Sequence, residues 1–131
     1  KLALLECAGW VEESMDVIAR RCLTKRHIRN RGVIDFVDNL IDKNYGFDYE
    51  RNFKKLICQI IGVAEFYKIE KNIDALKLSS FVGALNTLTT IRNTHAHTYI
   101  LNTTKPFYAP SWTINIFKEL YEGLTEFYRK I

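Results

Sequence analysis

The sequence predicts an all-α protein, folded as an up-and-down bundle of four to five helices. Apolar residues recur at steps of three and four along most of the chain, and no stretch alternates as a strand does. The chain has 131 residues, of which 47% are hydrophobic and 26% charged, as is typical of one globular domain. We therefore expect a single helical domain over residues 1–131. Because the first residue is Lys1 rather than Met, we expect this domain to be excised from a longer protein.

The first predicted helix runs from Lys1 to about Leu23. Trp10 lies beside its core-facing stripe, where it either extends the core or contacts a partner. The stripe consists of Leu4, Ala8, Val11, Met15, Ile18 and Cys22. Glutamates interrupt the apolar N-terminal stretch, so no signal peptide is predicted, and no apolar run approaches the ~18 residues of a membrane span. We expect a cytoplasmic protein without membrane contact.

Two helices are expected in the middle of the chain. Gly32 is the expected stop before a second helix over Val33–Asn44, whose apolar residues are Val33, Phe36, Val37, Leu40 and Ile41. A third, continuous helix is expected over Tyr49–Tyr67, with Phe53, Ile57, Ile60, Ala64 and Tyr67 on its core-facing stripe. Gly62 in this helix would allow a neighbouring element to approach closely, at a cost of about 1 kcal/mol in helix propensity.

The last two helices flank a turn-rich loop. A helix is expected to start near Ala75 or Ser79, with Asn72 or Asp74 as its cap. The final helix is expected over Trp112–Lys130 and carries two apolar rows. One row is Ile114, Phe117, Tyr121, Leu124, Tyr128 and Ile131, the other is Ile116, Leu120 and Phe127, and Ser111 is the expected cap. One row would serve the core, and the other a dimer or the preceding helix.

A basic segment follows the first apolar stripe. It contains Arg20, Arg21, Lys25, Arg26, Arg29 and Arg31, with His27 among them. Cations at the end of a helix complement its dipole, so this segment can be a solvated helix end. The alternative is an RNA-binding patch that follows the phosphates of a strand. The net charge of +4 and the pI of about 9.0 favour polyanionic partners without deciding between the two.

The cysteines and glycines exclude several kinds of site. Cys7, Cys22 and Cys58 are few and widely spaced, which favours reduced core residues of a cytosolic protein over a disulfide framework. No CxxC pair occurs and no cysteine lies near the paired histidines, so no zinc site is expected. The glycines are isolated and form no phosphate-binding loop. We expect neither a metal nor a cofactor.

The functional interpretation depends on residues 85–99, LNTLTTIRNTHAHTY. This stretch begins as an amphipathic helix and then places Arg92, Asn93, His95, His97 and Tyr99 within eight residues. On one unbroken helix Asn93 and His97 share a face, whereas Arg92 and His97 lie about 140° apart around the axis. They converge only if the helix bends or ends nearby, or if a second copy of the chain supplies half of the site. Turn-forming residues follow at 102–106, so we expect the helix to end or bend just after the histidines.

The stretch Arg92-Asn93-Thr94-His95-Ala96-His97 resembles the R-N-x-x-x-H motif of the HEPN superfamily of small helical domains. With Thr98-Tyr99 it takes the R-x4-H-x-Y form of HEPN toxins paired with a nucleotidyltransferase antitoxin. The correspondence in sequence is confined to this motif, and the expected helical architecture agrees with it. The resemblance implies a metal-independent ribonuclease that acts as a homodimer, with the two motifs facing each other across one cleft.

The chemistry of these side chains suggests a role for each. His97 is the candidate general acid or base, Arg92 the candidate phosphate clamp, and Asn93 would orient the imidazole or hold the phosphate. His95 is either a second acid or base or a polar residue near the helix end. Tyr99 is either a packed aromatic or, as the R-x4-H-x-Y form implies, the acceptor of adenylyl groups from a nucleotidyltransferase partner. An isolated arginine or histidine at such a position is usually a surface residue.

The sequence thus predicts an endoribonuclease of HEPN type that acts in antiphage defence or in a toxin–antitoxin system. Its expected products end in 2′,3′-cyclic phosphates. One alternative is a non-catalytic HEPN module that dimerises and binds RNA or nucleotide within a larger assembly. The other is an unrelated helical scaffold in which the motif is a coincidence.

Overall fold

The computed structural model describes the backbone of residues 2–101 and 110–131, and the side chains of residues 5–93 and 111–131. The described chain is all-α, as predicted, and has no strand. Its elements are α1 (Leu2–Lys25), α2 (Arg31–Asp42), the π-helical turn η1 (Tyr49–Lys54), α3 (Lys55–Ile61), α4 (Val63–Lys71), α5 (Ala75–Leu101) and α6 (Pro110–Lys130). Six α-helices therefore replace the four to five that the sequence predicted.

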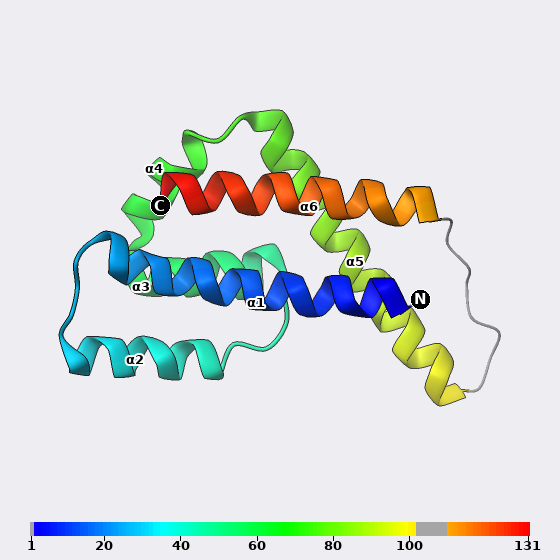
Figure 1. Cartoon of the computed structure of the whole chain (residues 1–131), viewed down its shortest axis with the longest axis horizontal. Coiled ribbons are helices and arrows are strands. Elements are labelled where there is room, and N and C mark those ends of the chain that lie inside the picture. Colours follow the sequence, from blue (N-terminus) through cyan, green and yellow to red (C-terminus); the bar gives the residue numbers. More distant parts are fainter. Residues whose placement is uncertain (1, 102–109) are drawn as a thin grey trace.

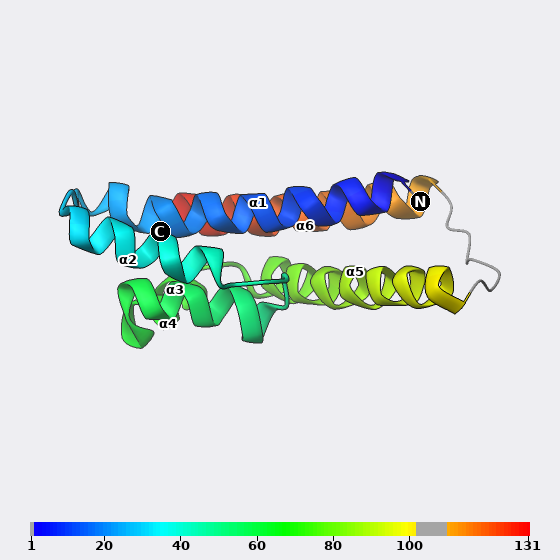
Figure 2. The same ribbon diagram turned by 90° about the horizontal axis from the view of Figure 1, so that it is seen from below.

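The helices form two layers. Helices α1 and α6 lie side by side and run in the same direction, while α5 crosses beneath them (Figure 1). The second layer holds α5 together with α3 and α4 (Figure 2). The C-terminal end of α5 lies at the same end of the bundle as the starts of α1 and α6. The motif helix thus reaches one end of the molecule with its last turns.

The buried residues of the described chain form one continuous hydrophobic core. On α1, Ala8, Val11, Met15, Ile18 and Cys22 are all buried, as the stripe predicted, and Leu4 lies outside the described side chains. The centre of the core is a cluster of rings, in which Phe53 meets Phe127 edge-on with 4.8 Å between the ring centroids. Phe66 and Phe81 pack against the same Phe127 ring. These rings join η1, α4, α5 and α6 through one contact region.

Helices α5 and α6 pack tightly against each other at Gly123. A Cβ atom on Gly123 would lie 2.3 to 2.5 Å from three side-chain atoms of Phe81 on α5. Only a residue without a side chain fits there. The sequence had assigned such a close approach to Gly62, where a Cβ would meet nothing within 4 Å. That expectation was wrong, because Gly62 instead breaks the predicted third helix.

The break at Gly62 divides the predicted helix into α3 and α4. Its φ of 93° and ψ of 154° lie in a region that residues with side chains rarely adopt. The break also shifts the buried face, so Ala64 and Tyr67 are exposed, whereas Phe66 and Ile69 are buried. The predicted apolar stripe was continued across Gly62, and it therefore assigned the wrong face of α4 to the core.

Two other local expectations, the helix stop at Gly32 and the cap at Ser111, need correction. His27, with a φ of 57°, rather than Gly32, lies in the turn that ends α1, and Gly32 lies in the first turn of α2. Asn30 caps α2 by accepting a hydrogen bond from the backbone N–H of Val33 at 3.2 Å. Ser111 lies inside α6, which begins at Pro110. By contrast, Asp74 caps α5 as expected, accepting from the backbone N–H of Lys77 at 3.1 Å.

The two apolar rows of α6 are divided differently from the prediction. The buried set is Ile116, Leu120, Leu124, Phe127 and Ile131, and the exposed set is Ile114, Phe117, Tyr121 and Tyr128. Trp10 of α1 is half-buried beside this exposed set and lies 4.8 Å from the ring of Phe117. Trp10 therefore extends the packing between α1 and α6.

On α2, the predicted core residues Val33 and Phe36 are exposed, Phe36 by 65%.

Candidate nucleic-acid site on α5

Helix α5 carries the whole motif on one stretch of α-helix. It continues without interruption through His95, His97 and Tyr99 and ends at Leu101, about one turn after His97. The helix therefore ends shortly after the histidines, as expected. The side chains of His95, His97 and Tyr99 lie outside the described residues. Since no break separates Arg92 from His97, the backbone directs these two positions about 140° apart around the axis.

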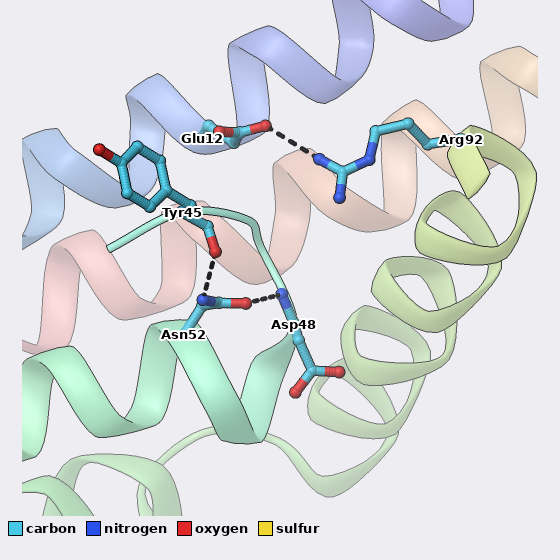
Figure 3. Close-up of polar contacts among 5 residues, drawn as sticks. All are labelled: Glu12, Tyr45, Asp48, Asn52 and Arg92. Atoms are coloured by element: carbon cyan, nitrogen blue, oxygen red, sulfur yellow. Dashed lines mark hydrogen bonds and ion pairs between the residues drawn. The ribbon is translucent and has the colours of Figure 1, made fainter. Parts of the chain in front are cut away.

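The side chain of Arg92 points from α5 toward α1, where it forms an ion pair with Glu12 (Figure 3). Its Nη1 donates to the Oε1 of Glu12 at 3.2 Å. The Cζ atom also lies 4.6 Å from the centroid of the Phe47 ring, so the guanidinium rests on an aromatic face. The side chain of Arg92 is 36% exposed and that of Glu12 is 41% exposed. The candidate phosphate clamp is thus held on two sides while remaining open to solvent.

Phe47 lies in the loop between α2 and η1, and its ring faces the guanidinium of Arg92. Asn52 of η1 fixes this loop (Figure 3). The Nδ2 of Asn52 donates to the backbone oxygen of Tyr45 at 2.7 Å, and its Oδ1 accepts from the backbone N–H of Asp48 at 2.9 Å. Gly46 has a φ of 101°, and a Cβ there would lie 3.0 Å from the Oδ1 of Asn52. The tight turn therefore needs glycine, and it leaves Phe47 buried at its end.

Asn93, the neighbour of Arg92, is exposed on α5. Its expected role was to orient the imidazole of His97 or to hold a phosphate. The partner side chain in the first of these roles is outside the described residues, so that role stays a prediction. Its exposure leaves it accessible to a ligand in solution.

The basic segment is divided between intramolecular contacts and exposed cations. Arg20 pairs with Asp38 at 3.6 Å, and Arg31 pairs with Asp35 at 3.3 Å. Arg21 and Arg26 are also engaged. Arg21 donates to the backbone oxygen of Tyr128 at 2.7 Å and lies over its ring, and Arg26 reaches Glu65 at 3.8 Å and the backbone oxygen of Cys22 at 3.1 Å.

Lys25 and Arg29 differ from these four cations. Both are exposed, and neither makes an ion pair with any residue that the structure describes. They lie at the end of α1 and in the turn before α2. If the segment contacts RNA, these two side chains are the best placed to do so, because they would give up no partner.

Among the grooves formed by described residues, two lie near α6, and Arg92 lines neither of these two. One, of about 510 Å³, runs between α1 and α6 and is lined by Trp10, Glu13, Ser14, Val17, Ile18, Tyr121, Leu124, Thr125 and Tyr128. The other, of about 380 Å³, lies between α5 and α6 and is lined by Asn86, Thr87, Thr90, Ile91 and Trp112. The first is mainly apolar and is flanked by the exposed row of α6.

The cysteines are free thiols rather than disulfide partners. Cys7 and Cys22 are buried, Cys58 is partly buried, and none of the three is in a disulfide. Burial raises the pKa of Cys22 to about 11. Among the described residues no group of three or more His, Cys, Asp or Glu side chains is placed to hold a metal ion. No described helix is long and apolar enough to cross a membrane.

Sequence reasoning missed Glu12, Phe47 and Asn52 as parts of this site. Glu12 had been assigned to the polar face of the first helix, and it is 80 residues away from Arg92 along the chain. Phe47 and Asn52 lie in and after a turn that showed no functional pattern. No local signal marks these residues, because only the packing of α1, η1 and α5 brings them together.

Comparison of the chain with protein-family models, curated proteins and solved structures found no match. The HEPN resemblance therefore depends on the motif in α5 and on the helical architecture.

Proposed function

We propose that this chain is a metal-independent endoribonuclease of HEPN type, acting on cytoplasmic RNA in antiphage defence or in a toxin–antitoxin system. The observation that carries the proposal is the placement of Arg92. Its guanidinium is oriented by two neighbours and open to solvent, on the same helix as His95 and His97. A partly solvent-exposed cation on the same helix as two histidines supplies the types of group that phosphodiester chemistry needs.

RNA cleavage without a metal needs a base, an acid and positive charge. The base takes the proton of the 2′-hydroxyl, which attacks the phosphorus, and the acid protonates the departing 5′-oxygen. Histidine can perform both transfers near neutral pH, because its unperturbed pKa is about 6.5. The arginine fork stabilises the negative charge that accumulates on the phosphate oxygens. The products would be a 2′,3′-cyclic phosphate and a 5′-hydroxyl.

Two chains are needed to assemble this site. Arg92 is directed toward α1 of its own chain, and the unbroken helix directs position 97 about 140° away. One committed histidine per chain also leaves a single site short of a second proton carrier. A homodimer that faces two motifs across one cleft would supply both groups. The motif lies on the last turns of α5, at one end of the bundle (Figure 1).

The test is cleavage of single-stranded RNA in EDTA by the wild type, Arg92→Ala and His97→Ala. We expect each variant to lose at least about 100-fold in rate, in line with the loss of a general acid–base group or of a charge-stabilising donor. Matched controls are Arg129→Ala, which removes an exposed cation outside the motif and the basic segment, and His27→Asn. Asparagine is chosen because it tolerates the positive φ of residue 27. Full activity in both motif variants would refute the proposal.

The second candidate is a non-catalytic HEPN module that dimerises and binds RNA or nucleotide within a larger assembly. The observation that favours it is the ion pair between Arg92 and Glu12, since a structural arginine would also hold such a partner. This candidate predicts RNA binding that weakens steeply with salt, and no cleavage.

Tyr99 belongs to either candidate as the proposed acceptor of adenylyl groups from a nucleotidyltransferase antitoxin. Incubation with that partner and ATP, followed by mass spectrometry of Tyr99→Phe, tests this role.

A further inference from the structure

We propose that Glu12 is a positioning residue for Arg92, and that it acts together with Phe47. Their contacts fix the plane of the guanidinium, so that its remaining N–H groups meet the scissile phosphate. The inference rests on the proposed ribonuclease function and adds to it a residue from α1, far from the motif in sequence.

The geometry of the guanidinium supports this role. The group is planar and offers five N–H donors in a rigid fork. Glu12 holds one edge through Nη1 at 3.2 Å, and the Phe47 ring covers one face, with Cζ 4.6 Å from its centroid. The donors on Nη2 and Nε form no hydrogen bond with any group that the structure describes. One edge and one face are therefore fixed, and a second edge is left for an anion.

The support behind Phe47 is rigid. Asn52 makes two hydrogen bonds to the loop backbone, at 2.7 and 2.9 Å, and a third to the side chain of Asn44 at 3.2 Å. Phe47 is buried at the end of this loop. A ring held in this way gives the guanidinium a fixed surface, which a residue on a mobile loop would not provide.

The solvent exposure of the ion pair between Glu12 and Arg92 favours a positioning role for Glu12 over a structural one. Both partners of the ion pair are more than a third exposed, and such pairs contribute little to folding stability. By contrast, a small displacement of a group that holds the reacting phosphate costs on the order of 100-fold in rate. Loss of Glu12 should therefore change catalysis far more than it changes stability.

The experiment compares Glu12→Gln with Glu13→Gln. Both remove one negative charge from α1, but Glu13 is exposed and lines the groove beside α6, away from Arg92. We expect Glu12→Gln to lower kcat about 10- to 100-fold, with KM changed less than about threefold and with an unchanged melting temperature. We expect Glu13→Gln to match the wild type in all three measurements.

A double-mutant cycle tests whether Glu12 acts through Arg92. In the Arg92→Ala background, Glu12→Gln should cause no further loss of rate, because the group that it positions is gone. Losses that multiply, a wild-type kcat in Glu12→Gln, or a faster rate in that variant would each overturn the inference. The last result would mean that Glu12 competes with the phosphate for Arg92.

The same data separate this inference from the proposed function. A wild-type chain that leaves RNA intact overturns both. A wild type that cleaves RNA and loses activity in Arg92→Ala, while Glu12→Gln remains fully active, overturns only the positioning role.

Discussion

Replacement of Gly123 by alanine tests the tight contact between Gly123 of α6 and Phe81 of α5. Gly123 is buried on α6, and an added Cβ would lie 2.3 Å from the Cγ, 2.4 Å from the Cδ1 and 2.5 Å from the Cβ of Phe81. These atoms are near the backbone of α5 or within a fully buried ring, so they cannot rotate away. Relief requires α5 and α6 to move apart.

The magnitude follows from two opposing effects. Alanine gains about 1 kcal/mol over glycine in helix propensity. Overpacking of a filled core costs about 1–3 kcal/mol and occasionally more, and three contacts this short place Gly123 at the upper end. We expect a net loss of about 2 kcal/mol in the free energy of unfolding, which is roughly 8 °C in melting temperature for a chain of this size.

The assay is urea unfolding followed by circular dichroism, with Gly83→Ala as the matched control. Gly83 lies exposed on α5, and a Cβ there meets nothing within 4 Å, so this variant should gain up to about 1 kcal/mol. Phe81→Leu should relieve part of the cost of Gly123→Ala in the double variant. A Gly123→Ala variant as stable as Gly83→Ala would refute the packing of α5 against α6.

Three further predictions concern the break between α3 and α4, the buried tyrosine and the basic segment. Gly62→Ala should lower the free energy of unfolding by about 2 kcal/mol, because the positive φ of 93° strains any residue with a side chain, although the space is open. Burial, together with the 2.5 Å hydrogen bond that its hydroxyl donates to Glu70, raises the pKa of Tyr49 above its usual value near 10. Above pH 10 the unfolded chain loses the hydroxyl proton of Tyr49, whereas the folded chain keeps it. The contribution of Tyr49 to the free energy of unfolding is therefore complete below pH 10. Above that pH it falls by about 1.4 kcal/mol per unit, as urea unfolding at pH 8 to 11 would show. Lys25→Ala and Arg29→Ala should each reduce the salt dependence of RNA binding by about one unit of slope, measured by fluorescence anisotropy.

Each of these has its own comparison. Gly9→Ala places the same side chain on an exposed helical site where a Cβ meets nothing within 4 Å, and equal stability in the Gly62 and Gly9 variants would contradict the strain. Tyr49→Phe should lose stability less steeply above pH 10 than the wild type, and parallel curves would contradict the raised pKa. Arg20→Ala removes a cation already paired with Asp38, so a slope change as large as that of Lys25→Ala would argue against the two exposed cations as the RNA contacts.

The periodicity of the sequence was sufficient for the helical class and for much of the core. The stripe on α1 is buried from Ala8 to Cys22, and Asp74 caps α5, because helix faces and caps depend on residues a few positions apart. The motif residues from Arg92 to Tyr99 lie on one helix for the same reason. The predicted continuous helix is wrong at Gly62, where a single backbone conformation divides it into two and turns Phe66 instead of Tyr67 into the core.

Only the tertiary structure decided which residues each exposed or paired side chain contacts. Glu12 and Phe47 reach Arg92 from separate elements, and nothing in their local sequence records this meeting. Gly123, rather than Gly62, is the point of close approach, because the crossing of α5 and α6 places Phe81 there. Local spacing determines helix faces, whereas contacts between distant residues depend on how the helices cross, and the candidate site is built from such contacts.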